Sequence, residues 1–510
     1  MRWQIHSEVP YNSADFFEKT LITDNGFREY DVRWRLSTKA NPNGEINPNG
    51  FVVLGRAFGT YVREVVGEEK VVVGHDFREY SQDLSRSFVV GLLWSGVDVV
   101  DIGLALSPML YFAQYHLGVK AGAMLTASHN ENGWTGLKLA DGLSSTLGPE
   151  GIQRFKEIVK KGSFSSGPGR YESCEDVFAA YADDIVGGKP LRHVVDVVVA
   201  AGNGTAGRFA PKVLEKLGCN VVPIDCDLNW DFPHHNPNPE DVSFLQSIGK
   251  AARTHDVKIG IGIDGDGDRI GIVDDTGKEV YSDKVALLVA RWLARQTPGR
   301  TLVVDVKSTG LFFSDPVLQE TDTKVIMVPT GHSYVKAAVA KNQAIAGFER
   351  SGHWFFNVPY GRGYDDSVQS AAQLLRMLDE SGVSLSKMLQ ELPRTWQSPT
   401  IGVVCPDDVK YALVAEMTER YEADRASVTP IAGTCIKELI EVNGVRFVME
   451  DGSWGLIRAS SNKPSLVLVA ESPNSEDQAY RIMMHIQGRL EATGKVGEYD
   501  QQMSPPPAVS

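Results

Sequence analysis

Three aspartates stand close together in the stretch IGIDGDGDRIGI (residues 261–272). Asp264, Asp266 and Asp268 alternate with glycines, and Arg269 follows them. Two carboxylates about 4 Å apart repel each other by about 4 kcal/mol at an effective dielectric constant of 20, so the cluster calls for a cation. Hard oxygen ligands on small spacers favour Mg²⁺ or Ca²⁺. An EF-hand is excluded because Arg269 stands where that loop needs glycine, whereas a solvated acidic turn remains an alternative.

A serine stands in a second polar loop, LTASHNENGWTGLKL (residues 125–139), between two apolar runs. Ser128 is either a surface serine in a turn or a nucleophile. The loop lacks the G-x-S-x-G pattern, which excludes the nucleophile elbow of a hydrolase. The chain also has no GxxxxGK[ST] motif, so it is not a P-loop nucleotide enzyme.

Three further loops carry polar groups that suit a phosphorylated sugar. His332 in VPTGHSYVK is a candidate catalytic base, although a lone histidine is more often structural. Glu349 and Ser351 in GFERSGH could bind sugar hydroxyls. An arginine fork with hydroxyl neighbours suits a phosphate, against an ordinary polar hairpin turn, and that set is Arg458, Ser460, Ser461, Asn462 and Lys463. Together with Ser128 and the aspartates, these groups indicate phosphoryl transfer through serine.

The loops follow a unit of secondary structure that recurs three times. In each copy a run rich in valine and isoleucine is followed by a helix-like stretch and two more apolar runs. Continuous apolar runs that alternate with helices are typical of parallel strands buried on both faces. The third run of each copy leads into a polar loop, and ligands bind outside the carboxyl ends of such strands. We therefore expect the loops to meet at one cleft. The predicted helices lie near residues 81–95, 208–217 and 311–320.

The pattern predicts an α/β protein with three related α/β domains, mostly parallel sheets, and a C-terminal α+β domain. The last domain should end with a helix near residues 476–491, and residues 37–50 look like a surface excursion. The expected domains are 1–168, 169–278, 279–393 and 394–498, and a disordered tail is expected over 499–510.

Composition narrows the class of protein. The chain has 51 Lys and Arg against 65 Asp and Glu, a net charge of −14, which argues against nucleic acid or anionic membrane as a general partner. The most apolar stretch, residues 88–106, is broken by glycines and aspartates and cannot span a membrane. Five scattered cysteines favour reduced thiols, and the start of the chain lacks a secretory pattern. We expect a cytoplasmic protein.

Nine motifs in order resemble the α-D-phosphohexomutases, particularly the phosphomannomutase/phosphoglucomutase branch. They cover nearly the full length: FREYDVR, GHDFREYS, LTASHN, GLKL, DGDGDR, DVKST, TGHSYVK, GFERSGH and RASSNKP. The resemblance implies a heart-shaped, four-domain enzyme around a central cleft. It also implies one Mg²⁺ per active site, hexose 1,6-bisphosphate as activator, a phosphosugar substrate, and a monomer or homodimer. The implied activity interconverts hexose 6-phosphate and hexose 1-phosphate, with mannose and also glucose as the sugar.

The resemblance also implies roles for particular residues. Ser128 would be a phosphoserine and a metal ligand together with the three aspartates, and Arg269 would hold the same phosphoryl group. His332 and Lys138 are similar to the acid/base residues of the family. The other matched positions are Tyr30 and Arg33 at the N-terminal edge of the site, Lys307 facing the sugar phosphate, Glu349 and Ser351 for the sugar hydroxyls, and Arg458, Ser460, Ser461 and Asn462 for the non-reacting phosphate.

The chain departs from the family pattern near the serine. Glu131 stands where proline is usual, Trp134 and Thr135 replace Tyr-Asn, and Asn462 replaces a common threonine. Because Glu131 adds a negative charge near Ser128, a metal-dependent sugar phosphatase or phosphotransferase is an alternative function. A phosphoglucosamine mutase is another, within the same family. A non-catalytic sugar-phosphate-binding protein is disfavoured, since it would not need a serine, three aspartates, a histidine and a lysine together.

Overall fold

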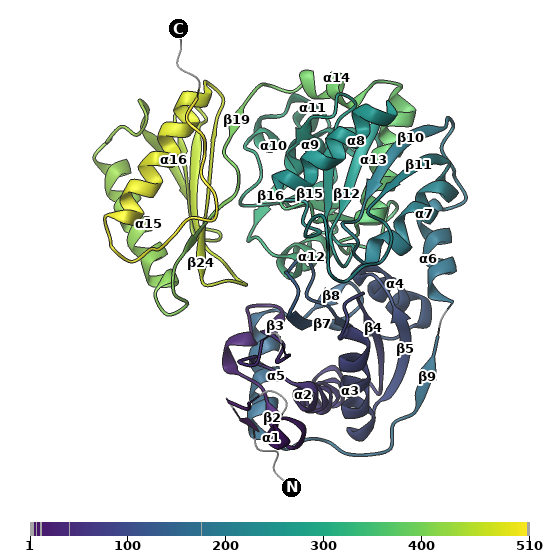
Figure 1. Cartoon of the computed structure of the whole chain (residues 1–510). Coiled ribbons are helices and arrows are strands. Elements are labelled where there is room, and N and C mark those ends of the chain that lie inside the picture. The colour runs from purple at the N-terminus through teal and green to yellow at the C-terminus, as the bar shows by residue number, and fades with distance from the viewer. Residues whose placement is uncertain (1–4, 7, 11–12, 40, 175, 507–510) are drawn as a thin grey trace.

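The computed structural model describes residues 5–6, 8–10, 13–39, 41–174 and 176–506. Four large sheets, each with its own helices, form four units that we call domains I to IV, and a fifth sheet has two short strands. Figure 1 shows domains I to III packed together and domain IV to one side, joined through strand β19. The predicted four-domain α/β fold is confirmed.

Domain I is built on a sheet in the order β3-β7-β6-β4-β5-β9. Helices α2 and α3 cross closely on one face, where a side chain at Gly55 or Gly91 would overlap backbone oxygen of the opposite helix. The elements are β1 (Ile5–His6), α1 (Ala14–Glu18), β2 (Thr20–Leu21), η1 (Asp24–Gly26), β3 (Val32–Arg35), α2 (Pro48–Tyr61), η2 (Val62–Val66), β4 (Lys70–His75), α3 (Ser81–Trp94), β5 (Asp98–Leu104), α4 (Ser107–Leu117), β6 (Ala121–Leu125), β7 (Trp134–Gly142), β8 (Ser145–Thr146), α5 (Pro149–Lys161) and β9 (Tyr171–Ser173).

Domains II and III repeat the same arrangement with smaller sheets. Their orders are β11-β10-β12-β13-β14 and β16-β15-β17-β18. Domain II contains α6 (Val177–Val186), β10 (Val195–Ala200), η3 (Thr205–Arg208), α7 (Ala210–Leu217), β11 (Cys219–Ile224), α8 (Val242–His255), β12 (Ile259–Ile263), β13 (Ile270–Val273) and β14 (Glu279–Val280). Domain III contains α9 (Ser282–Gln296), β15 (Thr301–Asp305), α10 (Leu311–Ser314), α11 (Pro316–Glu320), β16 (Lys324–Val328), α12 (His332–Lys341), β17 (Ala346–Phe348), β18 (Trp354–Phe356), α13 (Ser367–Ser381) and α14 (Leu385–Gln390).

Domain IV is an antiparallel sheet in the order β19-β24-β23-β22-β21, with β20 also paired to β24 and two long helices packed on it. The helix predicted near residues 476–491 is present as α16. The elements are β19 (Trp396–Gln397), β20 (Ile401–Val404), α15 (Lys410–Ala426), β21 (Ile436–Ile440), β22 (Val445–Met449), β23 (Trp454–Ala459), β24 (Ser465–Ser472) and α16 (Glu476–Glu491).

The three α/β sheets are mixed, which the apolar runs did not predict. In each, the first three strands of the recurring unit are parallel, as expected, and the fourth turns back antiparallel. The antiparallel partners are β6 with β7, β12 with β13, and β17 with β18. The polar loops are therefore the connections of three hairpins. In each hairpin the chain leaves one strand and re-enters the sheet along the neighbouring antiparallel strand. Each polar loop is therefore a short turn at one end of two paired strands.

Two predicted domain boundaries fall inside a sheet. β9 lies beyond residue 168 but pairs with β5 of domain I. β14 begins at residue 279 but pairs with β13 of domain II. Both strands are short and lack an apolar run, so their pairing is set by edge hydrogen bonds rather than by a buried face. The helix predicted near residues 311–320 is likewise two short helices, because Asp315 caps a new helix that starts at Pro316.

Two segments expected at the surface are ordered by specific contacts. Within the predicted excursion over residues 37–50, Asn47 is fully buried and caps α2 through the Gly50 N–H. The predicted disordered tail is wrong at its start: Tyr499 forms a bridge with Val403, and the Gly402 N–H donates to the Asp500 carboxylate (2.7 Å). Residues 507–510 of that tail lie outside the described residues. Because the start of the tail is polar, the sequence has no apolar run there that would predict its pairing with the edge of β20.

Domains I to III share one continuous apolar core, which includes Leu110 of α4, Tyr181 of α6 and Leu374 of α13. Domain IV has a separate core between its sheet and α15 and α16. No helix in the described part of the chain combines the length and apolar character that crossing a membrane requires. The packing makes domains I to III one body, to which domain IV is attached.

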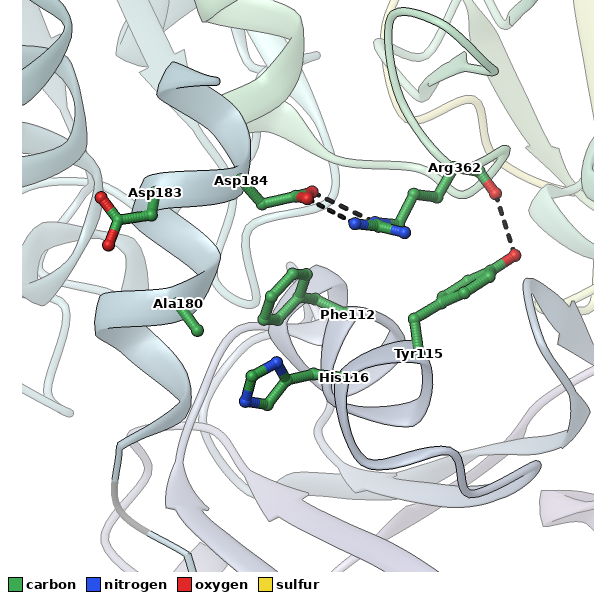
Figure 2. Close-up of a pocket in the computed structure, with 7 residues that line it drawn as sticks. All are labelled: Phe112, Tyr115, His116, Ala180, Asp183, Asp184 and Arg362. Atoms are coloured by element: carbon green, nitrogen blue, oxygen red, sulfur yellow. Dashed lines mark hydrogen bonds and ion pairs between the residues drawn. The ribbon is translucent and has the colours of Figure 1, made fainter. Parts of the chain in front are cut away.

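Arg362 joins the first three domains at their common junction. Its guanidinium pairs with Asp184 of α6 and lies over the rings of Phe112 and Tyr115 of α4, while its carbonyl accepts from the Tyr115 hydroxyl at 3.3 Å. A hollow of about 530 Å³ lies at this contact, and His116 is one of the residues that line it. Figure 2 shows these lining residues. The hollow is lined by none of the predicted site residues, so it is separate from the site described next.

Candidate active site

The loops after β6 and β12 meet face to face. The Ser128 hydroxyl donates to one carboxylate oxygen of Asp264 at 3.1 Å, and both side chains are buried. A side chain at Gly265 would come within 2.5 Å of the Ser128 carbonyl, so glycine is needed for the loops to approach this closely. The predicted serine and the predicted metal motif therefore form one site.

The three aspartates of the metal motif are fully buried, and one oxygen of each lies within 4.8 Å of the others. The second oxygen of Asp264 accepts the backbone N–H groups of Gly267, Asp268 and Arg269 at 3.0–3.2 Å, which fixes its orientation. Burial, together with the charges of Asp268 and Asp266, raises the pKa of Asp264 well above its usual value. The protein alone thus leaves the cluster with an excess of negative charge.

A divalent cation fits this donor set. Asp266 and Asp268 each keep one buried carboxylate oxygen, Oδ1, that has no hydrogen-bond partner among the described residues. An unpaired buried carboxylate oxygen is costly unless a cation binds it. The unpartnered oxygens, and the Asp264 oxygen that accepts from the Ser128 hydroxyl, offer hard ligands of the kind Mg²⁺ prefers.

Lys138 lies in β7 with its ammonium group against this cluster. It donates to Asp266 at 2.7 Å and also to Asp268, and its side chain is 2% exposed. The lysine is thus on the aspartate side of the site, and its ion pairs, rather than a contact with Ser128, hold it there. It balances part of the charge that the three aspartates leave.

The loop that carries Ser128 is held by a buried ion pair that sequence reasoning missed. The guanidinium of Arg78 donates to the carbonyls of Ser128 (3.0 Å), Asn130 (2.7 Å) and Glu131 (3.1 Å). Asp76 binds Arg78 at 3.3 Å and accepts from the Ala127 N–H at the same distance. Ser128 adopts a left-handed conformation, with φ of 52°. Three hydrogen bonds to one fork hold the loop in this unfavourable geometry.

His353 is a second residue that the sequence analysis missed, although it ends the GFERSGH motif. Its Nε2 accepts from Arg269 Nε at 2.9 Å, and its Nδ1 lies 3.0 Å from the Asp365 carboxylate. The Nδ1 is also 3.7 Å from Asp268. An imidazole between a guanidinium and a carboxylate, beside the aspartate cluster, has the contacts expected of an acid/base group.

His332 lies on the other side of the site, at the start of α12. Its Nε2 is 3.2 Å from Asp31, and the ring of Tyr30 stands edge-on to it at 4.9 Å. Burial and the charge of Lys336 lower the pKa of His332, so the ring is neutral near pH 7. Arg33 binds Asp31 at 3.1 Å and donates to the Thr126 carbonyl at 2.8 Å, which ties this cluster to the serine loop.

Hydrogen bonds to Glu349 fix the conformation of the sugar loop, GFERSGH (residues 347–353). One oxygen of Glu349 accepts the Gly331 N–H at 2.7 Å, and the other accepts from the Ser351 hydroxyl at 2.9 Å. Lys307 is also buried. Burial raises the pKa of Glu240, but the charges of Lys307 and Arg269 outweigh burial and lower that pKa. The Glu349 carboxylate thus joins the loops that contain His332 and Ser351.

The predicted phosphate loop connects β23 to β24 in domain IV. Arg458 donates to Asn443 at 2.6 Å and to the Ser461 hydroxyl at 3.2 Å, and Asn462 donates to the Tyr30 hydroxyl of domain I at 3.3 Å. Ser460 accepts the Lys463 N–H, which closes the turn. The loop therefore contacts the domain I edge of the site through Asn462 and Tyr30.

The departures near Ser128 lie outside the reacting centre. Glu131 is exposed, and only its carbonyl points inward, to Arg78. Trp134 is half-buried, its carbonyl accepts from the Tyr80 hydroxyl at 2.7 Å, and Arg35 lies over its ring. A solvated Glu131 carboxylate adds little charge at the serine, which removes the reason for a phosphatase.

Four α/β domains, with a buried serine against an acidic cluster, define a phosphotransferase that uses several domains for one site. The chain matches the alpha/beta/alpha domains I, II and III and the C-terminal domain described as phosphoglucomutase/phosphomannomutase, over residues 24–166, 179–277, 281–396 and 401–488. The chain belongs to this family, the α-D-phosphohexomutases. It is a phosphotransferase isomerase that interconverts hexose phosphates.

Relatives align over almost the whole chain. A phosphomannomutase/phosphoglucomutase of Pseudomonas aeruginosa is 32% identical over 469 residues, which cover 91% of this chain and 95% of that protein. A phosphoglucomutase of Neisseria gonorrhoeae is 33% identical and covers 88% and 94%. A crystal structure of a phosphoglucomutase/phosphomannomutase family protein from Burkholderia thailandensis has a TM-score of 0.82 at 30% identity, with 93% and 98% covered.

Proposed function

We propose that the chain interconverts the 6- and 1-phosphates of mannose, and those of glucose, through a phosphoserine at Ser128 and a hexose 1,6-bisphosphate intermediate. The observation that carries this proposal is the 3.1 Å contact between the Ser128 hydroxyl and Asp264, beside two unpartnered carboxylate oxygens. The names of the relatives support mannose and glucose as the sugars.

The residues divide the chemistry of transfer among them. The bond between Ser128 Oγ and phosphorus breaks as a free hydroxyl of the sugar phosphate attacks, and the hydroxyl proton passes to a base. His353 is placed for that proton by its contacts with Arg269 and Asp365. Arg269 neutralises charge on the transferred phosphoryl group, which is the main requirement of this reaction. The bisphosphate then turns over and returns its other phosphoryl group to Ser128.

Other residues hold the sugar and the phosphate that does not react. Glu349 and Ser351 would bind sugar hydroxyls, with Lys307 beside them and with Tyr30, Arg33 and His332 at the edge of domain I. Mg²⁺ held by Ser128 and the three aspartates would supply charge neutralisation for the phosphoryl group. Phosphate-loop residues must accept either end of the sugar, and those assigned to it are Arg458, Ser460, Ser461 and Asn462.

The proposal is tested by comparing rates on mannose 1-phosphate, glucose 1-phosphate and glucosamine 1-phosphate, with Mg²⁺ and a trace of hexose bisphosphate. We expect turnover of the first two without net release of phosphate, and loss of turnover in EDTA that Mg²⁺ restores. Glu349→Ala should lower turnover far more than it lowers phosphorylation of Ser128. Faster turnover of glucosamine 1-phosphate, or stoichiometric phosphate release, would overturn the assignment.

A further inference from the structure

An ion pair joins domain I to domain IV beside the phosphate loop. Arg28 Nη1 donates to the Asp407 carboxylate at 3.1 Å, although 379 positions separate the two residues in the chain. The Arg28 side chain is 12% exposed and the Asp407 side chain 48%. Arg28 stands just before β3, in the FREYDVR motif, and Asp407 just before α15. In Figure 1 the lower end of domain IV faces the part of domain I that contains β3.

The other carboxylate oxygen of Asp407 binds Lys410, which in turn binds the phosphate loop. It accepts from the Lys410 ammonium at 2.7 Å, and the Lys410 side chain is only 4% exposed. The same ammonium donates to the carbonyls of Ser460 (2.6 Å) and Lys463 (3.1 Å). A lysine has three N–H donors, so these three oxygens use all of them. One buried cation thus holds both ends of the phosphate loop, and Asp407 is its counter-charge.

The ionisation state of Asp407 is consistent with these contacts. Burial raises the pKa of Asp407, but the hydrogen bond and charge of Lys410 and the charge of Arg28 outweigh it, so the carboxylate is ionised near pH 7. A second contact between the same surfaces is the bond from Asn462 to the Tyr30 hydroxyl, two residues from Arg28. Since domain IV has its own apolar core, these polar contacts set how its loop meets domain I.

We infer that Arg28, Asp407 and Lys410 form a latch that orders the phosphate loop when domain IV lies against domain I. The three are positioning residues: Lys410 binds the loop backbone, and Asp407 and Arg28 act on the loop through Lys410. This inference rests on the proposed function only in that the loop binds the non-reacting phosphate. Because that phosphate stays bound throughout transfer, loss of the latch weakens ground state and transition state alike, which raises KM and spares kcat.

The test uses Arg28→Gln, Asp407→Asn and the double variant in the full-length enzyme. A single ion pair with a half-exposed partner contributes little, so Arg28→Gln should raise KM for hexose 1-phosphate about two- to fivefold. Asp407→Asn also loosens Lys410 and should raise KM about tenfold, with kcat within about twofold of wild type. The double variant should match Asp407→Asn, because both changes break one chain of contacts.

The matched control is Asp477→Asn, which removes an exposed pair with Arg481 (2.7 Å) on α16 of the same domain and should leave KM unchanged. Hydrogen exchange gives a second readout: Asp407→Asn should speed exchange over residues 459–464 and not over α16. Unchanged KM and exchange in both single variants, or KM effects that multiply in the double variant, would overturn the latch. Lack of mutase turnover in wild type and control alike would overturn the proposed function instead.

Discussion

The ammonium group of Lys138 lies 2.7 Å from the carboxylate of Asp266, inside the cluster expected to bind the metal ion. Burial alone lowers the pKa of Lys138, but Asp266 and Asp268 outweigh it and raise that pKa well above the usual value. A lysine that is charged at every pH of interest cannot accept a proton in this arrangement. It can donate one, and it competes with a cation for the same carboxylates.

Lys138→Met should therefore have opposite effects on metal binding and turnover. Removing the positive charge should tighten Mg²⁺ binding, because the aspartates lose a competitor, while kcat should fall by about 10²- to 10⁴-fold if Lys138 donates a proton. Isothermal titration with Mg²⁺ and steady-state kinetics measure the two effects. Lys120→Met, which removes an exposed pair with Glu68, is the control. Weaker Mg²⁺ binding with normal turnover would contradict this reading.

Ser128→Ala should abolish the phosphorylated fraction of the purified enzyme. The hydroxyl is buried against Asp264 and is the group we assign to carry the phosphoryl group. Intact-mass spectra before and after incubation with hexose bisphosphate measure the phosphorylated fraction. Ser145→Ala, at an exposed position in the same domain, should keep the wild-type spectrum. Equal phosphorylation of the Ser128 variant and wild type would show that another residue carries the phosphate.

The two histidines of the site should differ in how they affect catalysis. His353→Asn should lower kcat by about 10²- to 10⁴-fold, the usual contribution of a general acid or base, since His353 contacts Arg269 and Asp365. His332→Asn should mainly raise KM, because His332 packs on Tyr30 at the edge of the site. Steady-state kinetics of both variants separate the roles. The reverse pattern, with the larger kcat loss at His332, would restore His332 as the acid/base residue.

Several features of the site can be predicted from the sequence because buried strands appear in it as continuous apolar runs. The apolar runs before Ser128 and Asp264 predicted parallel strands, and the rule that ligands bind at their carboxyl ends predicted that the loops meet. The structure has these two side chains in contact. The family resemblance rested on motifs in the same loops. Hydrophobic pattern and motif order therefore sufficed to predict the four-domain α/β fold and the meeting of these two loops.

Side-chain networks left no such signal. His353 ends a motif used for its glutamate and serine, and its partner Asp365 stands twelve positions further on, in no pattern of its own. Arg78 lies in a motif that supported the family but suggested no contact with the Ser128 loop. Antiparallel strands such as β18 and the paired tail near Tyr499 depend on backbone hydrogen bonds, which no residue type encodes. These features depend on the three-dimensional packing of the chain.

Glu471 of β24 lies at the junction of domains III and IV. It accepts from Lys284 of α9 (2.7 Å) and from the hydroxyls of Thr309 (2.8 Å) and Thr395 (2.6 Å). Trp454 also donates to it, at 2.7 Å. Burial raises the pKa of Glu471, but Lys284 and the hydroxyl donors outweigh burial and lower that pKa to about 2. The ionised carboxylate thus stabilises the attachment of domain IV.

Because this pKa is lower in the folded protein than the ordinary value of 4.5, the stabilisation is present above pH 4.5 and is lost as the pH falls towards 2. The difference corresponds to on the order of 3 kcal/mol. Glu471→Gln should lower the melting temperature at pH 7 and flatten its decline between pH 5 and pH 3, as followed by scanning calorimetry. Glu438→Gln, at an exposed position of β21, should keep the wild-type profile. If the melting temperature of Glu471→Gln falls with pH as steeply as that of wild type, the ionised Glu471 carboxylate does not stabilise the contact between domains III and IV.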